Sequence, residues 1–226
     1  MATLSISNRS FTFADFGPLL EHPQRVSLSP SARTSIRNSN KTLGIILASQ
    51  KPVYGVNTGF GKLSDISIPP EEQNQLQLNL VRSHAAGVGK PFDLGVTRIA
   101  MVLKILTMAK GYSGVRIDVP EQIMFFLNHD ILPIMPRQGS VGASGDLAPL
   151  AHMALALIGE GEVHFQERIL PAMVALKEAG REPLELHAKE GISLVNGTQV
   201  STALGLKAVI EADRIIKSAD IAGALS

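Results

Sequence analysis

The chain has 226 residues, of which 45% are hydrophobic and 18% are charged, enough for a substantial core in one or two domains. The formal net charge is only +1, which argues against nucleic acid or an anionic membrane surface as a partner. The absence of cysteine excludes disulfides and thiolate metal sites. The N-terminus lacks the apolar segment of a secretion signal, and no apolar run approaches the ~18 residues of a membrane span. We therefore expect a cytoplasmic protein.

The N-terminal part of the chain is expected to combine short extended pieces with one helix. Apolar and polar residues alternate at 10–14, which predicts an extended segment. Ser29 or Ser31 can cap a helix that reaches about Ala48. Residues 52–56 are then expected to be extended and to lead into a glycine-containing loop.

The middle of the chain has the most regular helical pattern. A helix is expected to follow the two prolines at 69–70. Residues 94–110 form a longer helix, ended by Gly111, whose apolar positions nearly encircle it, so we expect it to be buried at the centre. A further helix over 120–128 and an extended segment over 131–136 complete this part.

The C-terminal part is also predominantly helical. The pattern predicts a helix over 147–158, a hairpin over 162–169, a short helix over 171–179 and a helix from Thr198 onward. No internal repeat or linker is present, so residues 1–226 form a single region. The expected fold class is mainly α, with a few short strands near the N-terminus and around the hairpin.

One stretch, residues 139–152, has an unusual composition: Gly-Ser-Val-Gly-Ala-Ser-Gly-Asp-Leu-Ala-Pro-Leu-Ala-His. Glycines at its first, fourth and seventh positions allow a very tight backbone. Asp146 stands where the N-cap of the following helix belongs. The residues alone fit a glycine turn that caps a buried helix. They do not fit a nucleophile elbow, because Asp146 occupies the position two after Ser144, where that motif needs glycine.

Centred on Ala143, Ser144 and Gly145, this stretch resembles the signature of the histidine and aromatic amino acid ammonia-lyases. In that family the tripeptide Ala-Ser-Gly cyclises and loses two waters, giving a methylidene-imidazolone (MIO) electrophile. The amide nitrogen of Gly145 would attack the carbonyl of Ala143, and a side chain at Gly145 would obstruct that approach. The Ser144 hydroxyl would leave as water. The resemblance implies that these three catalytic residues supply the MIO group and that no external cofactor is needed.

A second motif, Tyr-Gly-Val-Asn-Thr-Gly-Phe-Gly over 54–61, resembles another segment of the same family. There the tyrosine removes the β-proton of the substrate, which implies that Tyr54 is catalytic. A tyrosine ordinarily titrates near ~10, so this role needs a neighbour that favours the phenolate. Without the resemblance, a tyrosine beside glycine is more often a packed turn residue. The loop is not a phosphate-binding loop, because Val56 replaces its first glycine and Leu63 follows the lysine.

The sequence Ser-His-Ala-Ala-Gly, which begins at Ser83, resembles the specificity segment of the histidine-specific ammonia-lyases. There the histidine faces the substrate imidazole, which implies substrate binding by His84. Helical spacing also places Leu76, Leu80 and His84 on one face, where His84 can be a packed core residue. Phenylalanine-type lyases carry bulkier apolar residues here, whereas tyrosine-type lyases can also use histidine. The segment therefore favours histidine as substrate without deciding it.

A further motif, Leu-Val-Asn-Gly-Thr-Gln over 194–199, also matches the family. The family places this asparagine beside the MIO ring and the substrate amine, so Asn196 is expected to bind substrate. The residues alone fit equally well an Asn-Gly turn before a helix.

Four residues could be considered as metal ligands: His152, Glu160, Glu162 and His164. Their spacing matches no metal-binding motif, so we expect no metal. His152 follows Gly145 by two helical turns and is expected to be structural.

The resemblance covers this chain as the N-terminal half of a family member. The other half normally supplies an arginine for the substrate carboxylate, another tyrosine, a glutamine and a glutamate. We therefore expect the chain to be a fragment, a truncated form or one piece of a split subunit. Family members are tetramers, which implies a homo-oligomer.

The activity that the resemblance implies is elimination of ammonia from a small amino acid, L-histidine, to give urocanate. A tyrosine or phenylalanine ammonia-lyase is the first alternative. The second alternative is an inactive half-lyase that acts as a binding or assembly partner.

Overall fold

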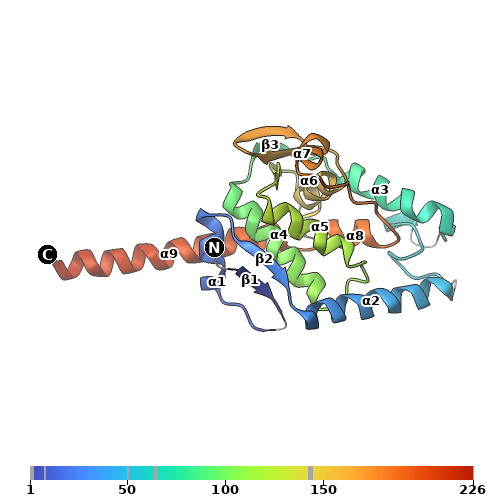
Figure 1. Cartoon of the computed structure of the whole chain (residues 1–226), viewed down its shortest axis with the longest axis horizontal. Coiled ribbons are helices and arrows are strands. Elements are labelled where there is room, and N and C mark those ends of the chain that lie inside the picture. The colour runs from blue at the N-terminus through green and yellow to red at the C-terminus, as the bar shows by residue number, and fades with distance from the viewer. Residues whose placement is uncertain (1–2, 8, 50, 64–65, 142–144, 226) are drawn as a thin grey trace.

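A computed structural model describes residues 3–7, 9–49, 51–63, 66–141 and 145–225. The fold is mainly α, as expected (Figure 1). The helices are α1 (Phe13–Glu21), α2 (Pro30–Ala48), α3 (Gln73–His84), α4 (Leu94–Ala109), α5 (Asp118–Asn128), α6 (Leu147–Leu157), α7 (Ala172–Glu178), α8 (Glu190–Val195) and α9 (Gln199–Leu225). Two short 3-10 turns, Gly61–Leu63 and Pro70–Glu72, lie before α3.

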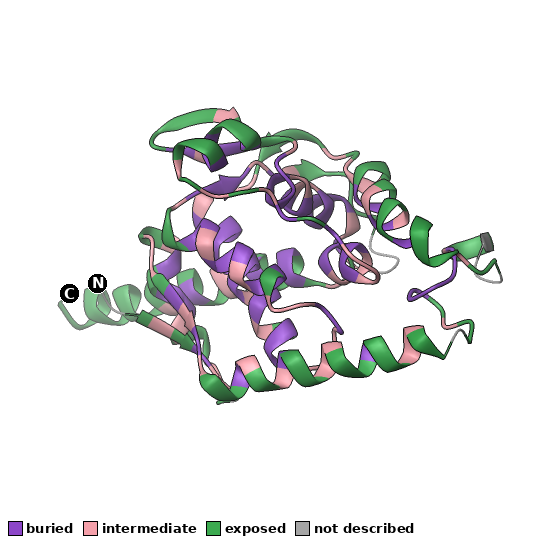
Figure 2. Cartoon of the chain, turned by 45° about the vertical axis from the view of Figure 1, so that its right-hand side comes forward, coloured by how far each residue is buried: buried purple, intermediate pink, exposed green. Residues whose placement is uncertain are grey.

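Helix α4 is the centre of the fold. It packs against α1, α2, α5 and α9, and most of its side chains are buried, which confirms the central helix predicted from its apolar positions. Buried residues gather around it in the middle of the molecule (Figure 2). Gly111, just after the helix, has φ +79°, the left-handed conformation expected of a residue that ends a helix.

A second group of helices, α3, α6 and α8, packs together. Helices α3 and α8 approach so closely that a Cβ on Gly191 would lie 2.7 Å from the carbonyl oxygen of Gln77. The buried side-chain oxygen of Gln77 also accepts a hydrogen bond from the Ile192 amide at 3.1 Å. These contacts fix the position of α8, the helix that leads directly into Asn196.

The strands are short and peripheral. β1 (Thr3–Ile6) pairs in parallel with β2 (Arg25–Leu28), and β3 (Val88–Pro91) pairs antiparallel with β5 (Pro136–Gln138). β4 (Leu132–Pro133), β6 (Glu162–Phe165) and β7 (Arg168–Pro171) form an antiparallel sheet. The predicted hairpin over 162–169 is therefore confirmed, and strands do lie near the N-terminus.

Two predicted extended segments are wrong. Residues 10–14 do not form a strand, because Thr12 precedes α1 and its amide donates to the Asp15 carboxylate at 2.7 Å. This local capping interaction stabilises a helix start over the alternating pattern. Residues 52–56 form turns rather than a strand, because the Asn57 side chain bonds the Val53 amide at 2.7 Å and the Lys51 carbonyl at 2.9 Å.

Helix α9 begins inside the molecule and ends outside it (Figure 1). Its first part packs on α4 and α1, and the pairs Lys207–Asp93 and Arg214–Glu21 join it to the body. Its last turns are exposed. Among the described residues, no helix is both long and apolar enough to cross a membrane.

Gly95 tests the close approach of α1 and α4. A Cβ at this position would lie 2.5 Å from the carbonyl oxygen of Leu20, so we expect Gly95→Ala to lower the free energy of unfolding by about 1–3 kcal/mol. The matched control is Gly205→Ala, also within a helix but with open space around the new methyl, expected to stabilise by about 0.5–1 kcal/mol. Urea unfolding measures both. A Gly95→Ala variant as stable as the wild type would contradict this packing.

Candidate active site

The structure brings the end of the predicted catalytic tripeptide against the predicted asparagine motif. Gly145 forms an isolated parallel bridge with Gly197, and the Asp146 amide donates to the Gly197 carbonyl at 2.7 Å. Gly145 has φ +104°, and a Cβ there would lie 2.2 Å from that carbonyl oxygen. Only glycine fits this position. Ala143 and Ser144, the other two predicted residues, lie outside the described residues.

The Asp146 side chain does not cap the helix that it precedes. It stands at the expected N-cap position of α6 but makes no capping bond there. Instead, its carboxylate accepts a hydrogen bond from the Ser201 amide at 2.7 Å and another from the Ser201 hydroxyl. Ser201 lies in the first turn of α9, where amide groups lack partners within the helix. Asp146 therefore joins the start of α6 to the start of α9.

Asn196 follows the last residue of α8. Its amide donates to the Ile192 carbonyl at 3.0 Å, whereas the residue itself is exposed. The next residue, Gly197, has φ +140°, and a Cβ there would lie 2.4 Å from the Gln199 side-chain oxygen. The backbone of this turn is thus held in the structure while the Asn196 side chain is accessible to a ligand.

A buried lysine on α4, which we did not predict as a site residue, lies behind this turn. Lys104 is fully buried, and its Nζ donates to the carbonyls of Asn196 at 3.0 Å and Ser193 at 3.3 Å. Burial lowers the pKa of Lys104 to about 7, and the negative charge of Asp146 partly opposes that shift. The only signal in the sequence is one lysine within an otherwise apolar stretch of the central helix.

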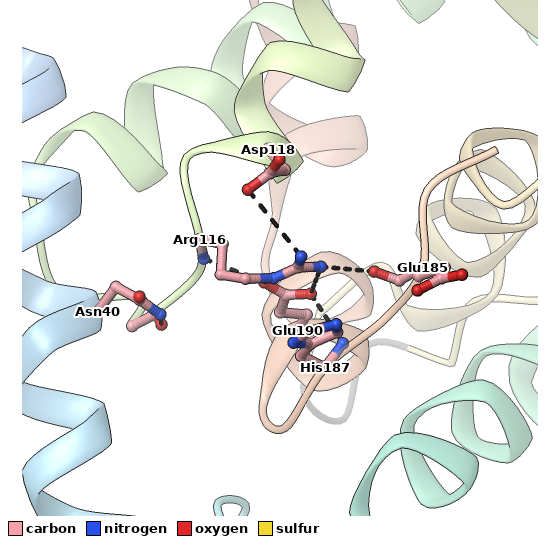
Figure 3. Close-up of polar contacts among 7 residues, drawn as sticks. Asn40, Arg116, Asp118, Glu185, His187 and Glu190 are labelled. Atoms are coloured by element: carbon pink, nitrogen blue, oxygen red, sulfur yellow. Dashed lines mark hydrogen bonds and ion pairs between the residues drawn. The ribbon is translucent and has the colours of Figure 1, made fainter. Parts of the chain in front are cut away.

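The start of α8 is held by an ion pair between the partly buried Arg116 and the fully buried Glu190 (Figure 3). Glu190 accepts hydrogen bonds from the Arg116 amide at 3.0 Å and from its guanidinium Nε and Nη2, both at 2.9 Å. The His187 amide donates to the same carboxylate at 2.8 Å, and Arg116 also donates to the Glu185 carbonyl. Since removal of one member leaves a buried charge unpaired, this cluster fixes the N-terminal end of α8.

His84 ends α3 and is half-buried. Its Nδ1 lies 2.8 Å from the Leu80 carbonyl, so Nδ1 carries the proton and Nε2 is the free acceptor. The segment after His84 contacts the glycine stretch, where a Cβ on Gly139 would lie 2.9 Å from the Cα of Gly87. The pairing of β3 with β5 continues this contact. The backbone just after His84 therefore packs against the segment that carries the tripeptide.

His152, expected to be structural, contributes to the same contact. Its Nε2 lies 3.0 Å from the Gly87 amide, so the unprotonated nitrogen accepts that hydrogen bond. Burial lowers the pKa of His152 below its ordinary value, which favours the neutral ring that this bond requires.

Tyr54 lies in the turn that precedes the glycine-containing loop. Its side chain is 66% exposed and its ring makes an edge-to-face contact with Phe60 at a centroid distance of 6.3 Å. In the part of the chain that the structure describes, no polar contact joins Tyr54 to Gly145, His84 or Asn196. Nor does any cluster of three or more potential metal ligands occur among those residues.

Comparisons with known proteins identify the family of this chain. Residues 11–226 match the family model described as aromatic amino acid lyase, and the chain belongs to that family. It is similar to the histidine ammonia-lyase of Bacillus subtilis, with 46% identity over 212 residues, 94% of this chain and 42% of that protein.

Two solved structures share the fold. The histidine ammonia-lyase from Trypanosoma cruzi has 36% identity and a TM-score of 0.90 over 98% of this chain and 43% of that chain. A tyrosine aminomutase from Streptomyces globisporus has 36% identity and a TM-score of 0.85 over 91% of this chain and 38% of that chain. The chain thus spans less than half the length of each of these relatives.

The His152 contact predicts a pH dependence of stability. Its pKa is lower in the folded state, so its contribution is complete above the ordinary value of 6.5 and is lost as the pH falls through the folded-state value. We expect the stability difference between wild type and His152→Gln to shrink from about pH 7 to about pH 5, measured by urea unfolding. A difference that stays constant over this range would contradict the assignment.

Proposed function

We propose that this chain carries the electrophile-forming part of an ammonia-lyase that eliminates ammonia from L-histidine to give urocanate. The observation that carries the proposal is the pairing of Gly145 with Gly197, which sets the end of Ala143-Ser144-Gly145 beside Asn196. We take residues 1–226 as a single region, because the described helices share one core. The cytoplasmic location and the homotetramer are proposed from the resemblance to the family and from the sequence. We propose the full activity and the assembly for a protein as long as its relatives, of which this chain would be one part.

The one described residue of the tripeptide, Gly145, fits the formation of an MIO group. Gly145 lies so close to the Gly197 carbonyl that it can carry no side chain. Because it has no side chain, nothing on Gly145 itself blocks the approach of its amide nitrogen to the Ala143 carbonyl. The Asp146 amide donates a hydrogen bond to the Gly197 carbonyl. This bond would fix the backbone just after the tripeptide during ring closure. When formed, the group would supply the electrophile for the reaction.

The remaining roles belong to side chains of this chain. Asn196 is exposed at the end of a fixed helix, where its amide can bind the substrate amine. His84 leaves Nε2 free to accept a hydrogen bond from an imidazole N–H. Tyr54 is the candidate base for the β-proton, and its exposed side chain is accessible to a substrate. In the elimination, Tyr54 would accept the proton of the β C–H bond, and the electron pair of that bond would form the double bond. The Cα–N bond would break with its electron pair on nitrogen, so that the amine leaves and is released as ammonia once protonated.

The alternative substrates are tyrosine and phenylalanine. The likeness to a tyrosine aminomutase supports an aromatic amino acid as the alternative. His84 favours histidine, because a polar ring nitrogen would be left without a partner against a phenyl side chain. An inactive half-lyase, acting as a binding or assembly partner, is the remaining alternative, and ammonia release by the 226-residue chain alone would exclude it.

Turnover measurements on a protein of the length of its relatives test these roles. We expect Tyr54→Phe to lower kcat for ammonia release from histidine by roughly 10²-fold or more. Asn196→Ala is expected to lower it by roughly 10²–10³-fold, because a polar contact made at the reacting groups is lost. Tyr112→Phe is the control, since Tyr112 is the other tyrosine and is 88% exposed. Equal activity of Tyr54→Phe and Tyr112→Phe would contradict the base assignment.

The substrate is tested by replacing His84. We expect His84→Leu to lower kcat/KM for histidine and to raise it for phenylalanine, because the apolar side chain removes the acceptor and fits a phenyl ring. Steady-state rates are measured from the absorbance of the products, urocanate from histidine and cinnamate from phenylalanine. Unchanged discrimination between histidine and phenylalanine would show that His84 does not contact the substrate ring.

A further inference from the structure

Lys104 is a charged side chain in the centre of the fold that no proposed reaction step uses. It is fully buried on α4, and its Nζ reaches the Asn196 carbonyl at 3.0 Å and the Ser193 carbonyl at 3.3 Å. Burying an ammonium without a compensating role is unfavourable. Both acceptors lie at the C-terminal end of α8, where carbonyl groups lack helical partners and carry partial negative charge.

The same turn is held at successive points. The Asn196 carbonyl bonds Lys104, the Gly197 carbonyl bonds the Asp146 amide at 2.7 Å, and the Asp146 carboxylate bonds the Ser201 amide at 2.7 Å. One turn further along α4, Thr107 accepts a hydrogen bond from the Gln199 side chain at 3.0 Å. Helix α4 therefore supports both ends of the turn that presents Asn196.

We propose that Lys104 is a positioning residue that holds the peptide after Asn196, and with it Gly197, in register with Gly145. This inference rests on the proposed function for the identity of the site, whereas the contacts themselves do not depend on it. Lys104 touches no substrate: it acts through the backbone of Asn196. Loss of its ammonium leaves two carbonyls at the end of α8 without their donor, so the turn can move away from Gly145.

The charge of Lys104 matters as well as its hydrogen bonds. Asp146, at the start of α6, is the ionisable group whose charge acts on Lys104. The second lysine near Ser193 is Lys189. Its Nζ lies 3.5 Å from the Ser193 hydroxyl and donates to the Ser113 carbonyl at 2.7 Å. Because a charged donor makes stronger hydrogen bonds than a neutral one, the turn is held most tightly while Lys104 is protonated.

Amide hydrogen exchange of Lys104→Met tests the proposal, because methionine fills a similar volume without the ammonium. The reporter is the Asp146 amide, whose bond to Gly197 reads the register directly. We expect its exchange to be at least roughly tenfold faster than in the wild type, relative to amides within α5. Lys189→Met is the matched control, since it removes another partly buried lysine attached to α8 without touching Asn196.

A pH series adds a readout that loss of packing alone would not change. Burial places the pKa of Lys104 at about 7, so wild-type protection of the Asp146 amide, corrected for intrinsic exchange, is expected to fall as the pH rises through that value. Lys104→Met lacks this step and Lys189→Met retains it. Equal protection in the two variants, or the same step in both, would overturn the proposal.

This experiment separates the inference from the proposed function. If the wild-type chain neither forms the electrophile nor releases ammonia, the proposed function fails, yet the exchange comparison still decides whether Lys104 holds the turn. If the wild type is active, Lys104→Met should also lower kcat by roughly tenfold or more, while KM for histidine changes by less than about threefold. Unchanged kcat with normal protection of the Asp146 amide would overturn the inference alone.

Discussion

The hydrogen bond from the Asp146 amide to the Gly197 carbonyl, 2.7 Å long, is the contact on which the site depends. It joins two loops that are about fifty residues apart and places Gly145 beside Gly197. The approach leaves no room for a Cβ at Gly145, so the close contact and the glycine require each other. The Asp146 carboxylate extends this junction to the start of α9. One short backbone segment thus connects α6, the asparagine turn and α9.

The helices around this junction are arranged to hold a short element in place. Helix α8 has only six residues and would not be stable alone. The Arg116–Glu190 pair fastens its N-terminal end, and Lys104 bonds the carbonyls at its C-terminal end. The central helix α4 therefore has two functions: its apolar side chains form the core, and its buried lysine supports the turn that carries Asn196.

Much of the fold follows from local sequence signals. The apolar positions of α4, the Ser29 cap of α2 and the hairpin after α6 were predictable, because each rests on periodicity or on neighbouring residues. The error at α1 arose because the bond between Thr12 and Asp15 outweighs an alternating pattern. The roles of Lys104 and of the Asp146 carboxylate were not predictable, because both depend on residues far away in the sequence. Motif resemblance located Gly145 and Asn196, and only the structure could place Gly145 beside Gly197, the residue after Asn196.

The intact mass of the purified 226-residue chain, measured beside Ser144→Ala, decides whether the junction at Gly145 and Gly197 holds a tripeptide that cyclises. We expect a wild-type mass two water molecules below the value for the sequence. We expect Ser144→Ala not to lose the water that comes from the serine hydroxyl. A wild-type mass equal to the sequence value would contradict this expectation, because the chain would then hold the junction without forming the electrophile.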